Sequence, residues 1–80
     1  MSENNFIELI GLNFGDWVQA PDDDSIGDNL TPLKVYQVIE IPRGALSLFY
    51  IEDDLGEVIA CVIGLADDHL NGLLWEKYNF

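Results

Sequence analysis

The chain has 80 residues, and fifteen Asp and Glu residues against three Lys and Arg residues give it a formal net charge of -12 at pH 7. Nucleic acids and anionic membranes are bound through Lys and Arg side chains that replace counterions, so this charge argues against direct binding to either. Apolar residues make up 49% of the chain, which is enough for one core and predicts a single domain over residues 1–80.

The few Cys and His residues exclude several kinds of site. One cysteine cannot form an internal disulfide, and one Cys with one His cannot supply a zinc site. Cys61 lies in the apolar run of residues 58–63, which is typical of a small buried side chain rather than a reactive thiol. The sequence has no Gly-rich phosphate loop, no apolar run of about 18 residues and no basic leader. We therefore expect a soluble, cytoplasmic protein without a metal or cofactor.

The first third of the chain predicts an arm, a strand and a long loop. Residues 1–13 form an N-terminal arm whose apolar spacing suits one or two helical turns, although Gly11 interrupts it and an extended arm fits equally well. Residues 14–20 read as a strand that ends at Pro21. Residues 21–32 are rich in Asp, Ser, Gly and Asn, a composition that favours an exposed loop.

The middle of the chain predicts three strands with tight connections. Residues 34–41 and 45–51 are joined by Pro42, Arg43 and Gly44, and an acidic turn over residues 53–56 leads into a strand over residues 57–63. Arg43 is expected to be a solvated turn residue. Apolar side chains occur on both faces of these strands, whereas a sheet with one wet face would alternate apolar with polar. We therefore expect the outer face to be covered by the chain ends or by another chain.

The last part of the chain predicts a closing element. Residues 66–70 can form one helical turn with Asp67 near its start, stopped at Asn71 and Gly72, which could instead form a hairpin corner. Residues 73–80 read as a final strand with Trp75, Tyr78 and Phe80 available to plug one end. The whole pattern predicts an all-β fold, a small SH3-like barrel of about five antiparallel strands with its core in residues 14–63 and its closing turn and last strand in residues 64–80.

Three stretches of this sequence resemble a known group of proteins. They are residues 15–18 (GDWV), residues 30–38 (LTPLKVYQV) and residues 50–57 (YIEDDLGE). In this order they resemble the small SH3-like barrel proteins carried by bacteriophages and prophages, and the matching positions are Lys34, Tyr36, Val38, Asp54 and Gly56. Leu33 stands where that group usually has a glycine, although leucine tolerates a positive φ poorly. The resemblance implies the barrel fold and a phage origin, but no common activity, because one barrel hosts many functions.

Two stretches could form a chemical site, but a purely structural role is favoured for each. Residues 22–27 (DDDSIG) are similar to the start of a calcium-binding EF-hand loop, but Ile26 and Leu33 occupy ligand positions without a side-chain oxygen, so a solvated loop is favoured. His69 beside Asp67 and Asp68 could shuttle protons. No companion nucleophile forms a recognisable motif with them, so a surface turn is favoured and we expect no enzymatic activity.

The acidic connections remain as the candidate binding surface. Over about 30 Å, the expected width of this chain, duplex DNA carries roughly 18 charges, so the net charge of the protein is within about a factor of two of that of DNA. The acidic residues that we predict to contact a partner are Asp22, Asp23, Asp24, Asp28, Glu52, Asp53, Asp54, Glu57, Asp67 and Asp68. In a small barrel the first loop and the middle turn can lie at different ends, so a contiguous patch does not follow from the sequence.

Two functions fit these features. The first is an inhibitor or regulator that binds a basic, nucleic-acid-handling host protein, such as a CRISPR or restriction effector, by electrostatic and steric occlusion as a DNA mimic. Trp17, Tyr50 or Trp75 would add apolar anchors if exposed. The second is a structural or homo-oligomeric phage assembly module that uses the apolar sheet face. In that case the acidic surface would serve only solubility.

Overall fold

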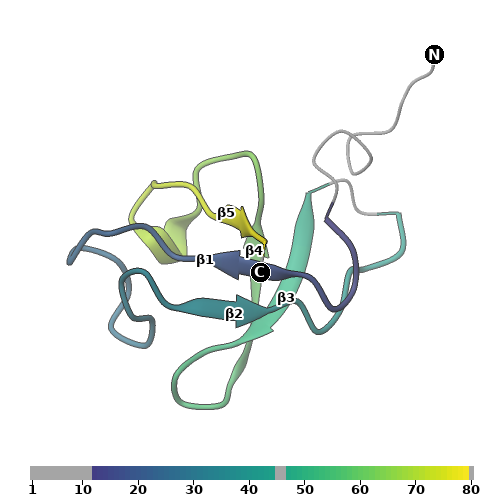
Figure 1. Cartoon of the computed structure of the whole chain (residues 1–80), viewed down its shortest axis with the longest axis horizontal. Helices are drawn as coiled ribbons and strands as arrows, with labels where there is room; N and C mark the ends of the chain where they lie inside the picture. Colours follow the sequence, from purple (N-terminus) through teal and green to yellow (C-terminus); the bar gives the residue numbers. More distant parts are fainter. Residues whose placement is uncertain (1–11, 45–46, 80) are drawn as a thin grey trace.

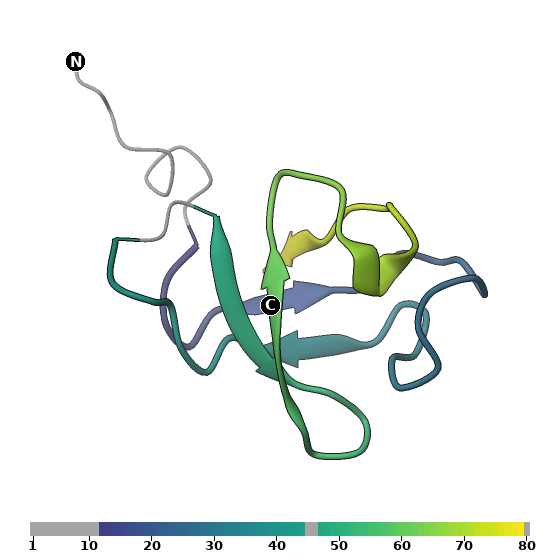
Figure 2. The same ribbon diagram turned by 180° about the vertical axis from the view of Figure 1, so that it is seen from behind.

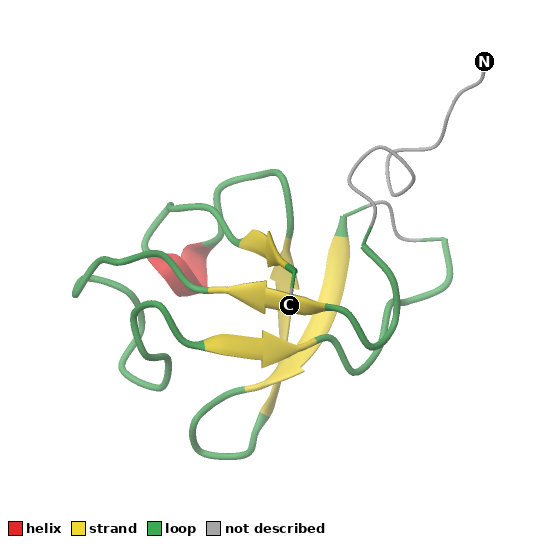
Figure 3. Ribbon diagram, in the orientation of Figure 1, coloured by secondary structure: helices red, strands yellow, loops and turns green. Residues whose placement is uncertain are grey.

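The computed structural model describes residues 12–44 and 47–79, which form an all-β domain with one turn of 3-10 helix (Figure 1, Figure 3). Most of the predicted N-terminal arm therefore lies outside the described residues. The elements are β1 (Trp17–Gln19), β2 (Val35–Gln37), β3 (Leu48–Glu52), β4 (Val58–Val62), the 3-10 helix η1 (Asp68–Leu70) and β5 (Glu76–Tyr78). The predicted all-β class, the five strands and the helical turn near residues 66–70 are confirmed. In this part of the chain no helix has the length and apolar character needed to cross a membrane.

The strands form two antiparallel sheets, one in the order β2-β1-β5 and one of β3 and β4. A bridge between Glu40 and Tyr50 links the sheets, because Ile39 N donates to Tyr50 O (2.9 Å) and Tyr50 N donates to Glu40 O (2.8 Å). The strands thus follow one path in the order β5-β1-β2-β3-β4. Among the described residues no ladder joins β4 to β5, so the closure expected of a barrel is not detected.

The strand β2 is shorter than the sequence predicts because the chain changes partners after it. Val38 N still donates to Asp16 O beside β1 (2.8 Å), whereas Ile39 N donates to Tyr50 O in β3. The backbone must turn between two strands that belong to different sheets, so the regular ladder ends at Gln37. This change of partner lets a chain with short strands wrap around one core.

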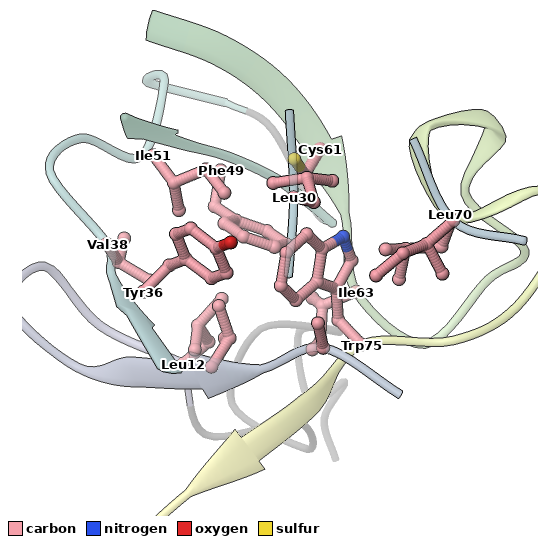
Figure 4. Close-up of a cluster of buried hydrophobic side chains, with 13 residues drawn as sticks. Leu12, Leu30, Tyr36, Val38, Phe49, Ile51, Cys61, Ile63, Leu70 and Trp75 are labelled. Carbon is pink, nitrogen blue, oxygen red and sulfur yellow. The ribbon is translucent and has the colours of Figure 1, made fainter. Parts of the chain in front are cut away.

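The core lies between the two sheets and is centred on aromatic side chains (Figure 4). Phe49 and Ile51 are fully buried, and the indole of Trp75 makes edge-to-face contacts with Tyr36 (centroids 5.8 Å apart) and Phe49 (5.9 Å). Trp75 is thus buried in the core, Tyr78 is half-buried, and Phe80, predicted with them to plug one end of a barrel, lies outside the described residues. The predicted burial of Cys61 is confirmed, since it is 1% exposed.

The outer face of β3 and β4 remains apolar and uncovered by the described residues. Cross-strand partners on this face are Leu48 with Val62, Tyr50 with Ala60, and Glu52 with Val58, and none of these side chains is buried. This arrangement confirms that the middle strands present apolar side chains on both faces.

Leu33 adopts the left-handed backbone conformation, with φ 66°. Its backbone therefore has a conformation that glycine adopts more readily than leucine, and its side chain gains little from packing because it is 52% exposed. The left-handed conformation costs a non-glycine residue about 1–2 kcal/mol of stability, and a glycine would remove this cost. Glycine also gains freedom in the unfolded chain, which lowers the stability by about 0.5–1 kcal/mol. The substitution Leu33→Gly should therefore stabilise the protein by about 0.5–1 kcal/mol in urea unfolding.

Leu74 supplies the matched control for this prediction. It is 51% exposed but is not among the described residues with a positive φ. The substitution Leu74→Gly should destabilise the protein by about 0.5–1 kcal/mol. Equal losses of stability in both variants would contradict the argument that the backbone of Leu33 is strained.

Candidate functional site

The three acidic connections converge on one end of the molecule. Gly27 N donates to His69 O (2.9 Å), which ties the first loop to η1, and Asp54 N donates to Asn29 O (2.8 Å), which ties it to the β3–β4 turn. Figures 1 and 2 place the first loop and η1 on the same side, opposite the loop that connects β2 to β3. We call residues 21–32, 53–57 and 67–70 the acidic end. The first loop and the β3–β4 turn therefore lie next to each other, which does not follow from the sequence.

Gly27 favours this close approach. A Cβ atom on Gly27 would lie 3.1 Å from the backbone oxygen of His69, which is tighter than about nine in ten Cβ contacts in proteins. The absence of a side chain therefore lets the first loop and η1 approach each other.

A cavity of about 170 Å³ lies where the connections meet. Asp28, Asp53 and Glu57 line it together with His69, so carboxylates from two of the three connections and a histidine from the third share one site. Asp28, Glu57 and His69 are exposed. Apolar side chains from Leu30 and Ile59 complete the lining. The arrangement combines negative charge at the surface with a small apolar area.

Asp54 joins the β3–β4 turn to β2 through a cluster of hydrogen-bonded side chains. Its Oδ1 accepts hydrogen bonds from Lys34 Nζ (2.6 Å) and Tyr36 OH (3.0 Å), and its Oδ2 accepts one from Thr31 Oγ1 (2.7 Å). Tyr36 OH in turn accepts a hydrogen bond from Thr31 N (2.8 Å). The sequence shows these residues as separate motif positions, and the fold brings them into one network.

This network changes the ionisation of its members. Burial alone would raise the pKa of Asp54, but hydrogen bonds from Lys34, Thr31 and Tyr36 and the charge of Lys34 outweigh it, so its pKa is lowered. The hydrogen bond to Asp54 raises the pKa of Lys34 against a smaller effect of burial. Burial is the largest cause that raises the pKa of Tyr36.

The lowered pKa of Asp54 predicts a defined dependence of stability on pH. The network stabilises the folded state when Asp54 is ionised, above its ordinary pKa of 3.8, and this contribution is lost as the pH falls through the lower pKa of the folded state. The difference in unfolding free energy between wild type and Asp54→Asn should be constant near pH 6 and should shrink below about pH 4. Urea unfolding between pH 2 and 6 measures it.

Asp24 provides the control for the pH experiment, because its exposed carboxylate carries the same charge and takes no part in the network of Asp54. Asp24→Asn should follow the wild-type profile in parallel. A difference between wild type and Asp54→Asn that stays constant down to pH 2 would show that the network does not depend on the charge of Asp54.

Asp67 connects β4 to the segment before β5, two elements between which no strand ladder is found among the described residues. Its Oδ2 accepts hydrogen bonds from Val62 N (2.9 Å), at the end of β4, and from Trp75 Nε1 (2.9 Å), just before β5. Its Oδ1 accepts from His69 N (2.8 Å) and so caps η1. Asp67 is 3% exposed. We predicted it as a partner contact, but its carboxylate is enclosed by donors of its own chain, so its role is structural.

Asp53 is also enclosed, and it shapes the β3–β4 turn. Its Oδ1 accepts hydrogen bonds from Leu55 N and Glu57 N, both at 2.9 Å, and the residue is 7% exposed. It cannot form part of an open acidic surface. It does reach the cavity between the connections, where it is the most buried of the three carboxylates.

The other predicted contacts lie nearer the solvent. Asp23 is half-buried and holds the first loop by accepting hydrogen bonds from Ser25 N (2.8 Å) and Ser25 Oγ (2.6 Å). Both hydrogen bonds lower the pKa of Asp23, and the one from Ser25 Oγ has the larger effect. The exposed members of the predicted set are Asp22, Asp24, Asp28, Glu52, Asp54, Glu57 and Asp68. Within the described residues no group of three or more His, Cys, Asp and Glu side chains is placed to hold a metal ion.

The three basic side chains leave the acidic end strongly negative. Lys34 forms an ion pair with Asp54 (2.6 Å), and Lys77 forms one with Asp16 (3.5 Å). Arg43 is exposed in the loop between β2 and β3, which lies at the opposite end of the molecule from the first loop (Figure 1). Of these three bases, Lys34 is the one that the structure shows paired with a carboxylate of the acidic end.

The apolar anchors differ from those that the sequence suggests. Trp75 is 3% exposed and cannot contact a partner, and Trp17 and Tyr50 are half-buried. Leu55, in the acidic turn, is 69% exposed, and Val58 at the start of β4 is 58% exposed. Sequence analysis missed Leu55, although its place between Asp54 and Gly56 in a polar turn is a signal that it cannot be buried.

Comparison with protein-family models, with curated proteins and with solved structures finds no match to this chain.

Proposed function

We propose that the chain is a non-catalytic acidic binding protein that occupies the nucleic-acid-binding surface of a basic partner protein. The observation that carries the proposal is the convergence of three acidic connections on one end, where Lys34 is already paired with Asp54. The phage-type motif around Lys34, Tyr36 and Asp54 supports a small SH3-like protein of phage origin that acts in the host cytoplasm. The partner is then a nucleic-acid-handling host protein, such as a CRISPR or restriction effector.

Simple electrostatics supports this mechanism. Exposed carboxylates without paired cations attract a surface that is built to bind phosphates, and they speed its association. Binding at that surface excludes nucleic acid by occupying the same volume. Leu55, exposed within the acidic end, offers an apolar contact that would slow dissociation.

A capture experiment followed by a competition assay tests the proposal. The tagged protein is used to recover proteins from bacterial lysate at about 50 mM and about 500 mM salt, because exposed charges are screened over shorter distances at high salt. We expect a basic nucleic-acid-binding protein at low salt, and its binding to labelled DNA should fall when the acidic protein is added. A recovered protein that binds DNA equally well in its presence would contradict the proposal.

Self-association through the outer face of β3 and β4 is a second candidate function. It is favoured by the exposure of apolar side chains there, with Leu48 39% and Val58 58% exposed. Contact between two such faces should strengthen in high salt, because salt screens the repulsion between two chains of net charge -12. Light scattering at both salt concentrations distinguishes the two functions: a discrete oligomer that persists at high salt supports self-association.

A further inference from the structure

The strand β4 lies at the edge of its sheet. It pairs with β3 on one side, and among the described residues no ladder forms on its other side (Figure 2). Asp53 N donates to Glu57 O (2.8 Å) and Ile63 N donates to Ser47 O (2.9 Å), so these are hydrogen-bonded pairs of the β3–β4 register. Hydrogen-bonded and non-hydrogen-bonded pairs alternate along an antiparallel ladder. The two pairs therefore determine which residues of β4 bond to β3 and which face the open side.

The alternation leaves two residues of β4 with open backbone groups. The N–H and C=O groups of Val58, Ala60 and Val62 point away from β3. Val62 N confirms this direction, because it donates to Asp67 Oδ2 (2.9 Å) on the open side. No hydrogen bond within the described residues pairs the backbone of Val58 or Ala60 on that side, and both residues are exposed. Two donors and two acceptors are thus open at the edge.

The open edge of β4 lacks the features that usually block strand pairing. Edge strands of soluble proteins commonly carry Lys, Pro or a bulge that prevents another strand from adding to them. β4 has the sequence VIACV, which contains no charged residue and no proline, and its register with β3 is continuous. Its outer face continues into the apolar side chains of Leu48 and Tyr50 in β3. The edge can therefore accept a further strand.

We propose that β4 pairs antiparallel with β4 of a second copy of this chain, around a two-fold axis at Ile59. Val58 of one copy then lies opposite Ala60 of the other, and each open N–H donates to an open C=O. Four hydrogen bonds form, and all the open groups of Val58 and Ala60 in both copies are paired. The open residues thus complement themselves, which identifies a second copy as the added strand. This inference rests on the second candidate function, self-association, and assigns the contact to the backbone edge of β4 rather than to the outer face.

The negative charge of the chain lies away from this contact. Glu57 precedes β4 and would lie opposite Cys61 of the other copy, so the two Glu57 residues are four residues apart along the paired strands, roughly 13 Å. This separation exceeds the Debye length of about 8 Å at 0.15 M salt. The dimer should therefore strengthen as the salt concentration rises. A strand of a basic partner, by contrast, would find no opposite charge within β4.

Sedimentation equilibrium between about 10 µM and 1 mM protein, at about 100 and 500 mM salt, measures the dimer. Two paired strands of five residues form a smaller contact than the standard interface of about 800 Å² per partner, so we expect a Kd on the order of 0.1–1 mM at the higher salt concentration. A mixture of ¹³C-labelled and unlabelled chains should show an NMR contact between the Hα atoms of Ile59 in the two copies. These atoms face each other in a non-hydrogen-bonded pair.

The substitution Ala60→Pro tests the edge itself. It removes an N–H that faces the open side and none that bonds to β3, so the β3–β4 ladder is kept. Two of the four hydrogen bonds of the dimer are lost, and the dimer should weaken at least about tenfold. Ala60→Ser keeps the N–H and should dimerise within about twofold of wild type.

A second pair of variants applies if Ala60→Pro does not fold. Val58→Glu places like charges near the two-fold axis, whereas Leu48→Glu adds the same charge on the outer face of β3, away from the edge. Both side chains are exposed in the monomer. Val58→Glu should weaken the dimer more than Leu48→Glu does, because only its charges lie close to each other across the axis.

Three results would overturn the assignment. They are a monomer at every protein and salt concentration, equal dimerisation of Ala60→Pro and Ala60→Ser, and a loss in Leu48→Glu that equals or exceeds the loss in Val58→Glu. The third result would leave self-association through the outer face standing, whereas the first would remove both. The low-salt capture of a basic protein remains an independent test of the function proposed for the acidic end.

Discussion

Replacing Asp67 by asparagine should lower the free energy of unfolding by about 3 kcal/mol. Oδ2 accepts from Val62 N and Trp75 Nε1, and Oδ1 accepts from His69 N, so donors approach both oxygens of a residue that is 3% exposed. An asparagine has only one acceptor atom, and whichever way it is turned, its NH₂ group meets a buried N–H. The loss is large for a domain of this size, whose total stability is on the order of 4–12 kcal/mol.

The neighbouring Asp68 provides the control, because it is exposed and has the same charge. Asp68→Asn should change the unfolding free energy by less than about 0.5 kcal/mol in urea at pH 7. Trp75→Phe removes one of the donors, so the loss caused by Asp67→Asn should be smaller in a Trp75→Phe background than in wild type. Equal stabilities of the Asp67 and Asp68 variants would contradict the role given to Asp67.

The rate at which Cys61 is modified should also measure the stability lost in Asp67→Asn. Burial, with a smaller contribution from the charge of Asp67, raises the pKa of the Cys61 thiol, so the folded protein should react slowly with thiol reagents. If modification requires unfolding, a loss of about 3 kcal/mol increases the rate about 100-fold. The modification rate of Asp67→Asn thus provides a second measure that does not rely on denaturant.

Raising the salt concentration from about 50 to about 300 mM should slow association with the basic partner at least about tenfold. The acidic end has no unpaired Lys or Arg among the described residues, so its potential extends into solvent over roughly a Debye length, which salt shortens. The dissociation rate should change much less, because the apolar contact proposed for the exposed Leu55 does not depend on screening. Stopped-flow or surface-based kinetics at several salt concentrations measures both rates.

Two double variants distinguish the charge of the acidic end from the net charge of the chain. Each removes two negative charges: one is Asp22→Asn with Asp24→Asn, and the other is Glu40→Gln with Glu76→Gln. All four side chains are exposed, but only the first two belong to the acidic end. The first double variant should associate several-fold more slowly than the second. Equal slowing would mean that only the net charge of the chain matters.

Short runs rich in apolar residues and bounded by turn residues predicted the five strands, because both signals are local properties of the sequence. Phe49 and Ile51 in β3 and Cys61 in β4 are buried at alternating positions, as expected. The end of β2 was not predictable in the same way. Val38 and Ile39 bond to different sheets, and that switch depends on the curvature of the whole fold rather than on either side chain.

The acidic residues show a different limit of sequence reasoning. Their positions in connections predicted exposure, and this holds for Asp22, Asp24 and Asp28. It does not hold for Asp53 and Asp67, because a short carboxylate can turn back to accept backbone N–H groups. The signal for Asp67 was present in its position at the start of a helical turn, where a capping side chain is expected to be occupied. Convergence of the three connections depends on long-range contacts such as that of Gly27 with His69.

The most direct measurement of the central claim is inhibition of DNA binding by the captured partner, with the two double variants compared side by side. The account predicts that Glu40→Gln with Glu76→Gln inhibits as well as wild type, while Asp22→Asn with Asp24→Asn requires a several-fold higher concentration for the same inhibition at about 100 mM salt. Equal inhibition by both double variants would contradict the claim that the acidic end occupies the nucleic-acid surface of its partner.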